Sequence, residues 1–260
     1  MEESTITVKN LCVFAYFFNS TKKIVDEVSF ALKRGERLAV VGDSGSGKSM
    51  IVNAVTSSLA DNCFATGQVL FNGDDLLKKR KSKNEYLGKN IVFIPQGGAE
   101  SLNPSLKIKT QMQEALRQAG HKLDKKDKKE FALFNLARAG LMNGEEILKK
   151  YPFEISGGEA QRVVLAMAMC AHAELIVADE PTRGIDQENV DAFWDCMNRD
   201  FASSSLIVVT HDMSVAKMCH YVLVLKEGRV QEYGKTEEVF ASPKNEYTKS
   251  LISASGARYD

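Results

Sequence analysis

The chain has 260 residues, enough for one large α/β domain or for one domain that carries a smaller subdomain. A hydrophobic fraction of 44% and a charged fraction of 26% are ordinary for a globular protein with a buried core. The 34 Lys and Arg residues balance the 34 Asp and Glu residues, so no global charge favours a dedicated nucleic-acid binder. The longest apolar run, 163–171, is far below the ~18 residues of a transmembrane helix, and the N-terminus lacks the features of a signal peptide. We therefore expect a cytoplasmic chain, unless a partner carries it to a membrane.

The five cysteines stand at positions 12, 63, 170, 196 and 219. Their number is odd and no pair has Cys-x-x-Cys spacing, so the sequence suggests neither a zinc site nor a disulfide framework. We expect small, buried, apolar thiols in a reducing compartment.

Strand and helix patterns alternate along most of the chain. Alternating or short apolar runs predict strands over 6–13, 25–32, 38–41, 69–71, 91–94, 175–178, 206–210 and 221–225. Turns at Asn72-Gly73 and Glu227-Gly228 predict hairpins, and a helix is expected over 49–59. Glycines become rare over 106–169 and helical periodicity takes over there, which predicts a helical insertion in an α/β core.

The same patterns give the expected organisation of the chain. We predict a single domain over 1–260, with a catalytic core over 1–96 and 170–235 and a helical subdomain over about 97–169. The tail over 236–260 is expected to form one or two helices around Pro243. The basic run Lys78–Lys83 is most simply a solvated loop, and the alternative is a phosphate-binding patch.

A phosphate-binding loop follows the 38–41 strand. The segment fits the pattern G-x-x-x-x-G-K-[ST] at every fixed position. Its residues are Gly42, Asp43, Ser44, Gly45, Ser46, Gly47, Lys48 and Ser49. The glycines let backbone N–H groups curl around phosphates, and the helix that follows adds its positive dipole. Lys48 would reach the outer phosphates, and Ser49 would hold Mg²⁺ through its hydroxyl. A strand before the loop and a helix after it favour this interpretation over a chance glycine-rich turn.

Two carboxylates end the 175–178 strand. Asp179 is placed to coordinate Mg²⁺, and Glu180 is placed to polarise a water for attack on the γ-phosphate of a nucleotide. Such a pair alone could belong to a surface turn, but the phosphate loop makes the catalytic interpretation strong.

A second anion site is suggested by a Ser-Gly-Gly turn that leads into a helix. It is formed by Ser156, Gly157, Gly158 and Glu159. Because the nucleotide already has one phosphate loop, a second site suggests that a nucleotide is shared between two chains. The alternative is an ordinary N-cap serine at a helix start.

In their order and spacing, these motifs resemble the nucleotide-binding subunit of an ATP-binding-cassette (ABC) transporter over essentially the whole chain. Gly42–Ser49 matches the Walker A loop of that family, and Leu175–Glu180 matches Walker B with its catalytic glutamate. Ile155–Glu159 matches the LSGGQ signature, with Ile in place of Leu and Glu in place of Gln. The resemblance implies an α/β P-loop NTPase core, in which a mostly parallel sheet is flanked by helices. It also implies an N-terminal antiparallel β subdomain, an inserted α-helical subdomain, and ATP and Mg²⁺ as ligands.

The resemblance assigns roles to further residues. Gln96 matches the Q-loop glutamine that contacts Mg²⁺ and the attacking water, and His211 matches the switch histidine that senses the γ-phosphate. Asp186, in Gly184-Ile185-Asp186, occupies the D-loop, where the family more often has Ala-Leu-Asp. In this family an aromatic residue stacks on adenine, and its position corresponds to Ala15 in this sequence. Phe14 and Tyr16 lie on either side, and Tyr16 is the candidate for this role.

Two short segments resemble the dipeptide, oligopeptide and nickel importers within this family. They are Ser101-Leu102-Asn103-Pro104, after Gln96, and the tail segment Glu246–Leu251, which is similar to a Pro-Tyr-Thr-Arg helix. Many peptide importers extend further with a cysteine-rich segment, but this sequence ends at Asp260 with no cysteine after Cys219. That departure weakens an assignment to the long peptide-importer subunits and leaves the shorter nickel type open.

The resemblance also implies partners. A second ABC subunit, identical or homologous, would pair head to tail with this chain, and each ATP would lie between Gly42–Ser49 of one subunit and Ser156–Gly158 of the other. Two permease subunits would dock their coupling helices near Gln96–Pro104, at the cytoplasmic face of the membrane. An extracytoplasmic binding protein would act indirectly, and no nucleic acid is expected.

Two alternatives stay open at this stage. An ABC ATPase of a DNA-repair or translation class is opposed by the zero net charge, the single cassette and the lack of a long coiled-coil insertion. A subunit that binds ATP for regulation alone is opposed by the presence of both Glu180 and His211.

Overall fold

The computed structural model describes residues 4–18, 20–78, 85–184 and 187–255. The chain divides into two compact units. Unit 1 comprises residues 1–83 and 205–260, and unit 2 comprises residues 84–204. The predicted catalytic core, 1–96 and 170–235, and the predicted helical subdomain, about 97–169, have other boundaries than these two units. That division of the chain stays a prediction.

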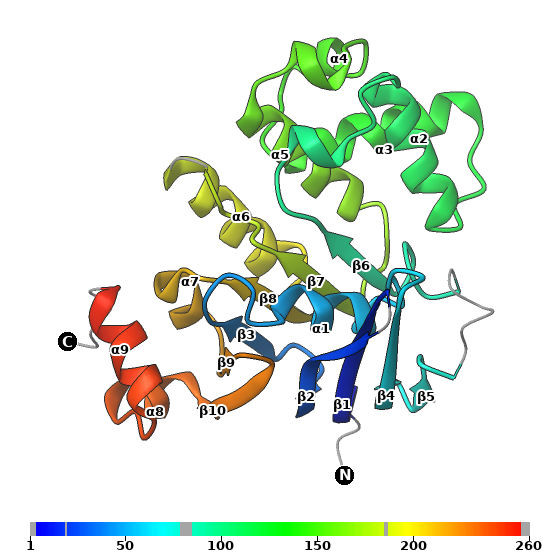
Figure 1. Cartoon of the computed structure of the whole chain (residues 1–260). Helices are drawn as coiled ribbons and strands as arrows, with labels where there is room; N and C mark the ends of the chain where they lie inside the picture. The colour runs from blue at the N-terminus through cyan, green and yellow to red at the C-terminus, as the bar shows by residue number, and fades with distance from the viewer. Residues whose placement is uncertain (1–3, 19, 79–84, 185–186, 256–260) are drawn as a thin grey trace. The chain divides into compact units, whose positions relative to one another are not determined.

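An antiparallel sheet forms the N-terminal part of unit 1 (Figure 1). In spatial order its strands are β2 (Ser20–Lys33), β1 (Ser4–Phe17), β4 (Cys63–Phe71) and β5 (Asp74–Asp75). Asn72 and Gly73 connect β4 to β5 with φ angles of 46° and 85°, the left-handed conformation that tight hairpins require. The predicted hairpin at this dipeptide is confirmed.

A second sheet region of unit 1 is mostly parallel. Its strands lie in the order β10 (Arg229–Lys235), β9 (Tyr221–Lys226), β3 (Arg37–Val41) and β8 (Ser205–Thr210). β3 pairs in parallel with both β8 and β9, whereas β10 returns antiparallel to β9 through the predicted turn at Glu227-Gly228. Every residue of β8 is buried, as expected for a parallel strand that is covered on both faces.

Four helices of unit 1 follow or flank these strands. They are α1 (Lys48–Val55), α7 (Met213–Lys217), α8 (Thr236–Ala241) and α9 (Glu246–Ala254). α1 ends before the predicted residue 59, because Thr56 Oγ1 donates to the Val52 carbonyl at 2.9 Å and Ser57 adopts a φ of 55°. α8 and α9 lie on either side of Pro243, as the tail pattern predicted.

Unit 2 contains a parallel strand pair and most of the helices of the middle of the chain. The strands are β6 (Ile91–Ile94) and β7 (Leu175–Asp179). The helices are η2 (Ala99–Ser101), α2 (Ile108–Gln118), α3 (Lys125–Arg138), α4 (Gly144–Ile147), η3 (Pro152–Glu154), α5 (Gly157–Ala168) and α6 (Gln187–Arg199). α2 and α3 both pack on α5, so the helices predicted for the middle of the chain are confirmed.

All five cysteines are free and buried, as expected from their spacing. Burial raises the pKa of the Cys170 thiol to about 11, and that of the Cys196 and Cys219 thiols to about 12. These three thiols stay protonated near neutral pH and act as small apolar groups in the core.

Among the described residues, no helix has both the length and the apolar character that a membrane crossing requires. Within the same ranges, no group of three or more His, Cys, Asp and Glu side chains is arranged to hold a metal ion. Of the basic run Lys78–Lys83, Lys78 alone is described, and the rest lies outside the described residues.

Candidate nucleotide-binding site

The phosphate loop joins β3 to α1. Gly42, Gly45 and Gly47 have φ angles of 152°, 81° and 103°, which residues with a side chain rarely adopt. Gly47 is the N-cap of α1, and no side chain caps the helix. The backbone N–H groups of the first helical turn are therefore turned toward the loop, where an anion would receive both hydrogen bonds and the helix dipole.

Lys48 lies at the start of α1 with its side chain turned back over the loop. Its Nζ donates to the carbonyl oxygens of Gly42 at 2.7 Å and of Asp43 at 2.8 Å, and the residue is 7% exposed. Ser49 is exposed directly after it. An ammonium, a helix start and a ring of loop amides fit phosphate oxygens, and a hydroxyl is a ligand type that Mg²⁺ accepts.

The end of β9 and the turn after it support the phosphate loop. The Gly228 N–H donates to the Ser46 carbonyl at 2.8 Å. A Cβ on Gly228 would lie 2.2 Å from the Ile24 carbonyl oxygen, and one on Gly42 would lie 2.0 Å from that of Leu225. The sequence predicts a hairpin turn at Glu227-Gly228 but not this supporting role, for which the glycine at a tight turn was the available signal.

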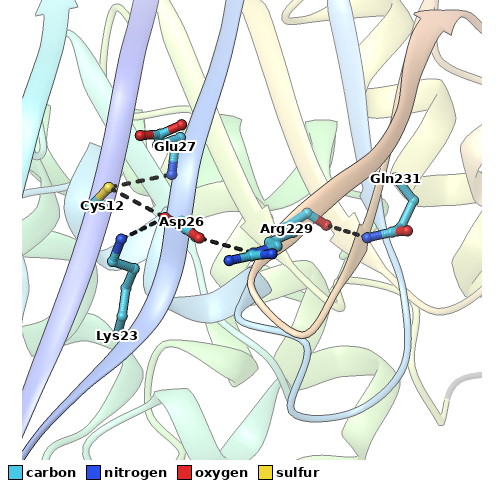
Figure 2. A network of polar contacts seen from close by, with 6 residues as sticks. All are labelled: Cys12, Lys23, Asp26, Glu27, Arg229 and Gln231. Atoms are coloured by element: carbon cyan, nitrogen blue, oxygen red, sulfur yellow. Dashed lines mark hydrogen bonds and ion pairs between the residues drawn. The ribbon is translucent and has the colours of Figure 1, made fainter.

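A polar network attaches the same turn to the N-terminal sheet. Figure 2 shows its members: Cys12, Lys23, Asp26, Glu27, Arg229 and Gln231. Asp26 accepts hydrogen bonds from Lys23 Nζ at 2.7 Å and from Arg229 Nε at 2.9 Å, and its N–H donates to the Gly228 carbonyl at 2.8 Å. The Lys23 hydrogen bond, with Arg229, lowers the pKa of Asp26 below its ordinary value. Asp26 therefore stays ionised and holds the turn that supports Ser46.

His211 directly follows β8, as predicted for a strand-end histidine. Val41 pairs with Thr210 in the parallel register, so Gly42 and His211 leave their strands at the same edge of the sheet. After His211, Asp212 caps α7 by accepting from the Ser214 N–H at 2.8 Å. Unit 1 therefore brings the exposed His211 and the phosphate loop to one sheet edge.

Tyr16 lies near the end of β1 and is 54% exposed. Its ring stacks on Phe64 with centroids 5.2 Å apart, and Phe14 stacks on the same ring at 4.8 Å. Both predicted neighbours of the adenine position therefore belong to one aromatic group, and the choice of Tyr16 stays a prediction.

In unit 2, Gln96 and the two carboxylates follow paired strands. Ile94 pairs with Ala178 in parallel register, so the exposed Gln96 and the pair Asp179 and Glu180 leave at a common sheet edge. Glu180 has a φ of 46°, a left-handed conformation that is uncommon for a residue with a side chain. Such strain is concentrated at functional sites, which agrees with the catalytic role predicted for Glu180.

The signature turn begins α5 with a reciprocal capping box. Ser156 Oγ accepts from the Glu159 N–H at 3.2 Å, and the Ser156 N–H donates to Glu159 Oε2 at 2.8 Å. The backbone hydrogen bond from Ser156 lowers the pKa of Glu159. Glutamate at this position therefore stays ionised and fixes the start of the helix, with Ser156 and Gly157 exposed.

Gln161, one turn into α5, connects the signature helix to the catalytic strand end. Its Nε2 donates to the carbonyl of Pro181, which directly follows Glu180. A Cβ on Gly98 would lie 2.6 Å from the Gln161 N and 2.9 Å from the Gly157 carbonyl oxygen, so the segment after Gln96 passes against α5. Unit 2 brings the Q-loop segment, the signature helix and the Glu180 turn together. Sequence analysis missed Gln161 and Gly98, and Asp186 lies outside the described residues.

Comparison with known proteins agrees with this geometry. The sequence model of the family described as "ABC transporter" matches residues 25–183. The chain belongs to the ABC transporter family. It is 35% identical to the dipeptide transport ATP-binding protein DppD of Lactococcus lactis, over 96% of this chain and 73% of that protein. It is 32% identical to the metal-staphylopine import system ATP-binding protein CntD of Staphylococcus aureus, over 95% of this chain and 92% of that protein.

Solved structures give the same fold. The dimeric structure of the bacterial ABC transporter cassette MJ0796 matches with a TM-score of 0.78 and 25% identity, over 89% of this chain and 98% of that one. A dimeric post-hydrolysis state of MJ0796 with ADP and Pi matches with a TM-score of 0.74 at 25% identity. The predicted α/β ABC ATPase fold is confirmed, and the chain is an ATP-hydrolysing enzyme.

Proposed function

We propose that this ABC ATPase powers the import of peptides, or of nickel or another metal as a chelate, through a membrane transporter. The observation that carries the proposal is the similarity of nearly the whole of this chain to DppD and CntD, whose names describe dipeptide transport and metal-staphylopine import. The segments Ser101–Pro104 and Glu246–Leu251, which resemble those of this importer group, agree with it.

In the proposed reaction, the phosphate loop binds and orients ATP. Lys48 and the loop amides neutralise the phosphates, and Glu180 takes the proton of the attacking water as that water adds to the γ-phosphorus. The bond between the γ-phosphorus and the β–γ bridging oxygen breaks in this step, which leaves ADP and inorganic phosphate. His211 contacts the γ-phosphate, and Gln96 orients the attacking water. Ser49, Asp179 and Gln96 would hold Mg²⁺, which supplies further neutralisation of the phosphate charge.

We further propose that Ser156, Gly157, Gly158 and Glu159 act on the ATP of a second ABC subunit, identical or homologous, in a head-to-tail pair. The capping box leaves Ser156 and Gly157 exposed at the start of α5, where they are accessible to a partner. The matched MJ0796 structures are described as dimeric, which supports a paired state. Asp186 belongs to the same proposed interface, and Tyr16 is proposed to stack on adenine.

A cavity in unit 2 suits a membrane partner. It measures about 300 Å³ and is lined mostly by apolar side chains, among them Phe93, Leu102, Val164 and Met167. Because Ser101 and Leu102, in the segment Gln96–Pro104, line this cavity, we propose that one of two permease subunits docks a coupling helix there and that the other docks on the second ABC subunit. This docking would hold the chain at the cytoplasmic face of the membrane. An extracytoplasmic binding protein would act on the chain only indirectly, through the permease subunits.

The nucleotide part of the proposal is tested with Lys48→Ala. The ammonium contacts the loop carbonyls rather than the apolar core, so its loss should abolish ATP binding without unfolding the protein. Unchanged ATP affinity in the folded variant would refute the role of Lys48.

The transport part is tested by isolating multi-span membrane proteins that co-purify with the chain and by reconstituting them with it in liposomes. ATP hydrolysis should rise when an extracytoplasmic binding protein loaded with peptide or with a nickel chelate is added. Stimulation by DNA or RNA without any membrane protein would instead favour an ABC ATPase of the nucleic-acid or translation class.

A further inference from the structure

The C-terminal helix α9 contacts the phosphate loop through one tyrosine. The Tyr247 hydroxyl donates to Asp43 Oδ2 at 2.7 Å and accepts from the Asp43 backbone N–H at 3.0 Å. Both residues belong to unit 1, although 204 positions separate them in the sequence. One phenol thus holds the carboxylate and the amide of the same loop residue.

Asp43 transmits this contact to Lys48. The Asp43 carbonyl oxygen accepts a hydrogen bond from Lys48 Nζ at 2.8 Å. The Asp43 N–H that donates to the phenol shares a peptide group with the Gly42 carbonyl, whose oxygen also accepts from Lys48 Nζ, at 2.7 Å. A hydrogen-bonded path therefore runs from the Tyr247 hydroxyl through the Gly42–Asp43 peptide group to the Lys48 ammonium. Hydrogen bonds in such a chain polarise one another, so the first bond influences the last.

The position of Tyr247 is itself well defined. The Glu232 carboxylate accepts from the backbone N–H groups of Lys244 at 2.9 Å and Asn245 at 3.1 Å, which attaches the start of α9 to β10. Asn245 caps α9 by accepting from the Tyr247 N–H at 2.8 Å. The Lys226 ammonium lies 4.7 Å from the centre of the Tyr247 ring. The phenol is therefore presented to the loop by a frame of β9, β10 and α9.

The protonation state of the phenol suits its contact with a carboxylate. Burial, and then the hydrogen bond to Asp43, raise the pKa of Tyr247 to about 12. The hydroxyl remains a donor at all physiological pH values. Without that donor, the exposed Asp43 side chain would be free to turn its negative charge toward bound phosphates, which it would repel.

We propose that Tyr247 is a positioning residue for ATP, which holds Asp43 so that the phosphate loop and Lys48 keep their nucleotide-binding arrangement. The tail segment Glu246–Leu251 thereby becomes part of the nucleotide site. The inference rests on the proposed binding of ATP by Gly42–Ser49.

The test is Tyr247→Phe, which removes the hydroxyl and keeps the ring that faces Lys226. The matched control is Tyr221→Phe, because the Tyr221 hydroxyl also contacts a carboxylate in unit 1, that of Glu36 at 3.3 Å. The dissociation constant of a fluorescent ATP analogue, the KM for ATP and the kcat are measured for both. For Tyr247→Phe we expect the dissociation constant and the KM to rise about three- to tenfold, with kcat changed less than about twofold. Tyr221→Phe should leave all three values unchanged.

A double-mutant cycle with Asp43→Ala shows whether Tyr247 acts through Asp43. The effect of Tyr247→Phe should shrink in that background, because the carboxylate is already gone. Wild-type affinity and KM in Tyr247→Phe, equal rises in Tyr221→Phe, or full additivity with Asp43→Ala would each overturn the inference. Wild-type ATP binding by Lys48→Ala would instead refute the proposed role of Lys48 in the phosphate loop, so the two failures are distinguishable.

Discussion

The phosphate loop of unit 1 and the signature helix of unit 2 are held by different kinds of contact. Around the loop, two close contacts join backbone to backbone: Gly228 donates to the Ser46 carbonyl, and Gly42 lies against the Leu225 carbonyl. Around the helix, they come from side chains, because Ser156 forms its capping box with Glu159 and Gln161 donates to the Pro181 carbonyl.

This difference predicts how each region responds to substitution. Backbone surfaces in contact leave no room for a Cβ, so a change at one of these glycines should damage stability and binding together. Side-chain contacts can be removed one at a time, so changes in unit 2 should alter catalysis or stability separately. Four variants examine this comparison, beginning with the largest expected effect.

The largest effect is expected from Gly228→Ala. Its Cβ would lie 2.2 Å from the Ile24 carbonyl oxygen, at a φ of +78° that alanine adopts poorly. We expect a loss of about 3 kcal/mol or more in the free energy of unfolding, together with weakened ATP binding. Urea titration and nucleotide titration measure the two.

Gly73→Ala is the matched control. Gly73 has a similar φ of +85° in another hairpin turn, but no atom lies within 4 Å of its added Cβ. It should lose about 1 kcal/mol and keep its ATP affinity. Equal effects of the two variants would show that backbone strain alone, without contact with β2, explains the result.

Glu180→Gln should separate catalysis from binding. Glutamine keeps the shape of the side chain but cannot take a proton, so turnover should fall about 10²-fold or more while ATP still binds and holds the paired subunits closed. Single-turnover hydrolysis, measured with the permease present, gives the rate. Wild-type turnover would reject Glu180 as the base.

Asp200→Asn should affect the stability of unit 2 alone. The Asp200 side chain is 2% exposed and is paired with Arg138 and Arg199. Burial acts to raise the pKa of Asp200, but the hydrogen bonds from Arg199 and Arg138 outweigh it, and the pKa is lowered from its ordinary value of 3.8. We expect a loss of about 1–2 kcal/mol near pH 7, with ATP affinity unchanged.

The pH dependence of that loss checks its cause. A carboxylate whose pKa is lower in the folded state stabilises the protein above its unfolded pKa, and this stabilisation disappears as the pH falls through the folded pKa. The difference between wild type and Asp200→Asn, measured by urea unfolding, should therefore shrink below about pH 4. A difference that is constant from pH 7 to pH 3 would contradict an ionic origin.

Sequence patterns predicted the local parts of this arrangement well. The 38–41 and 206–210 strands, the loop between Gly42 and Ser49 and the hairpin turns are encoded by short apolar runs and by glycines, which act within a few residues. The end of α1 was placed too late, because the left-handed conformation of Ser57 is not marked by a glycine.

Contacts between distant segments were not predictable in this way. Tyr247 and Asp43, or Gly228 and Ser46, meet because the folding of the sheet brings their elements together, and no local pattern records that approach. Gln161 is similar, since an amide on a helix gives no signal that its partner is the carbonyl after Glu180. Tyr247 lies in a tail segment and Gly228 in a turn that the sequence marks for other reasons, and neither pattern indicates a contact with the phosphate loop.

The central claim is that the signature of one chain acts on the ATP bound by another. Ser156→Arg tests it most directly, because Ser156 is exposed at the start of α5 and Lys48 belongs to the other unit of the chain. ATP affinity of the isolated chain and ATP hydrolysis by the assembled transporter are measured side by side. The account predicts nearly unchanged affinity with hydrolysis abolished. Loss of ATP binding by the isolated, well-folded variant would contradict it.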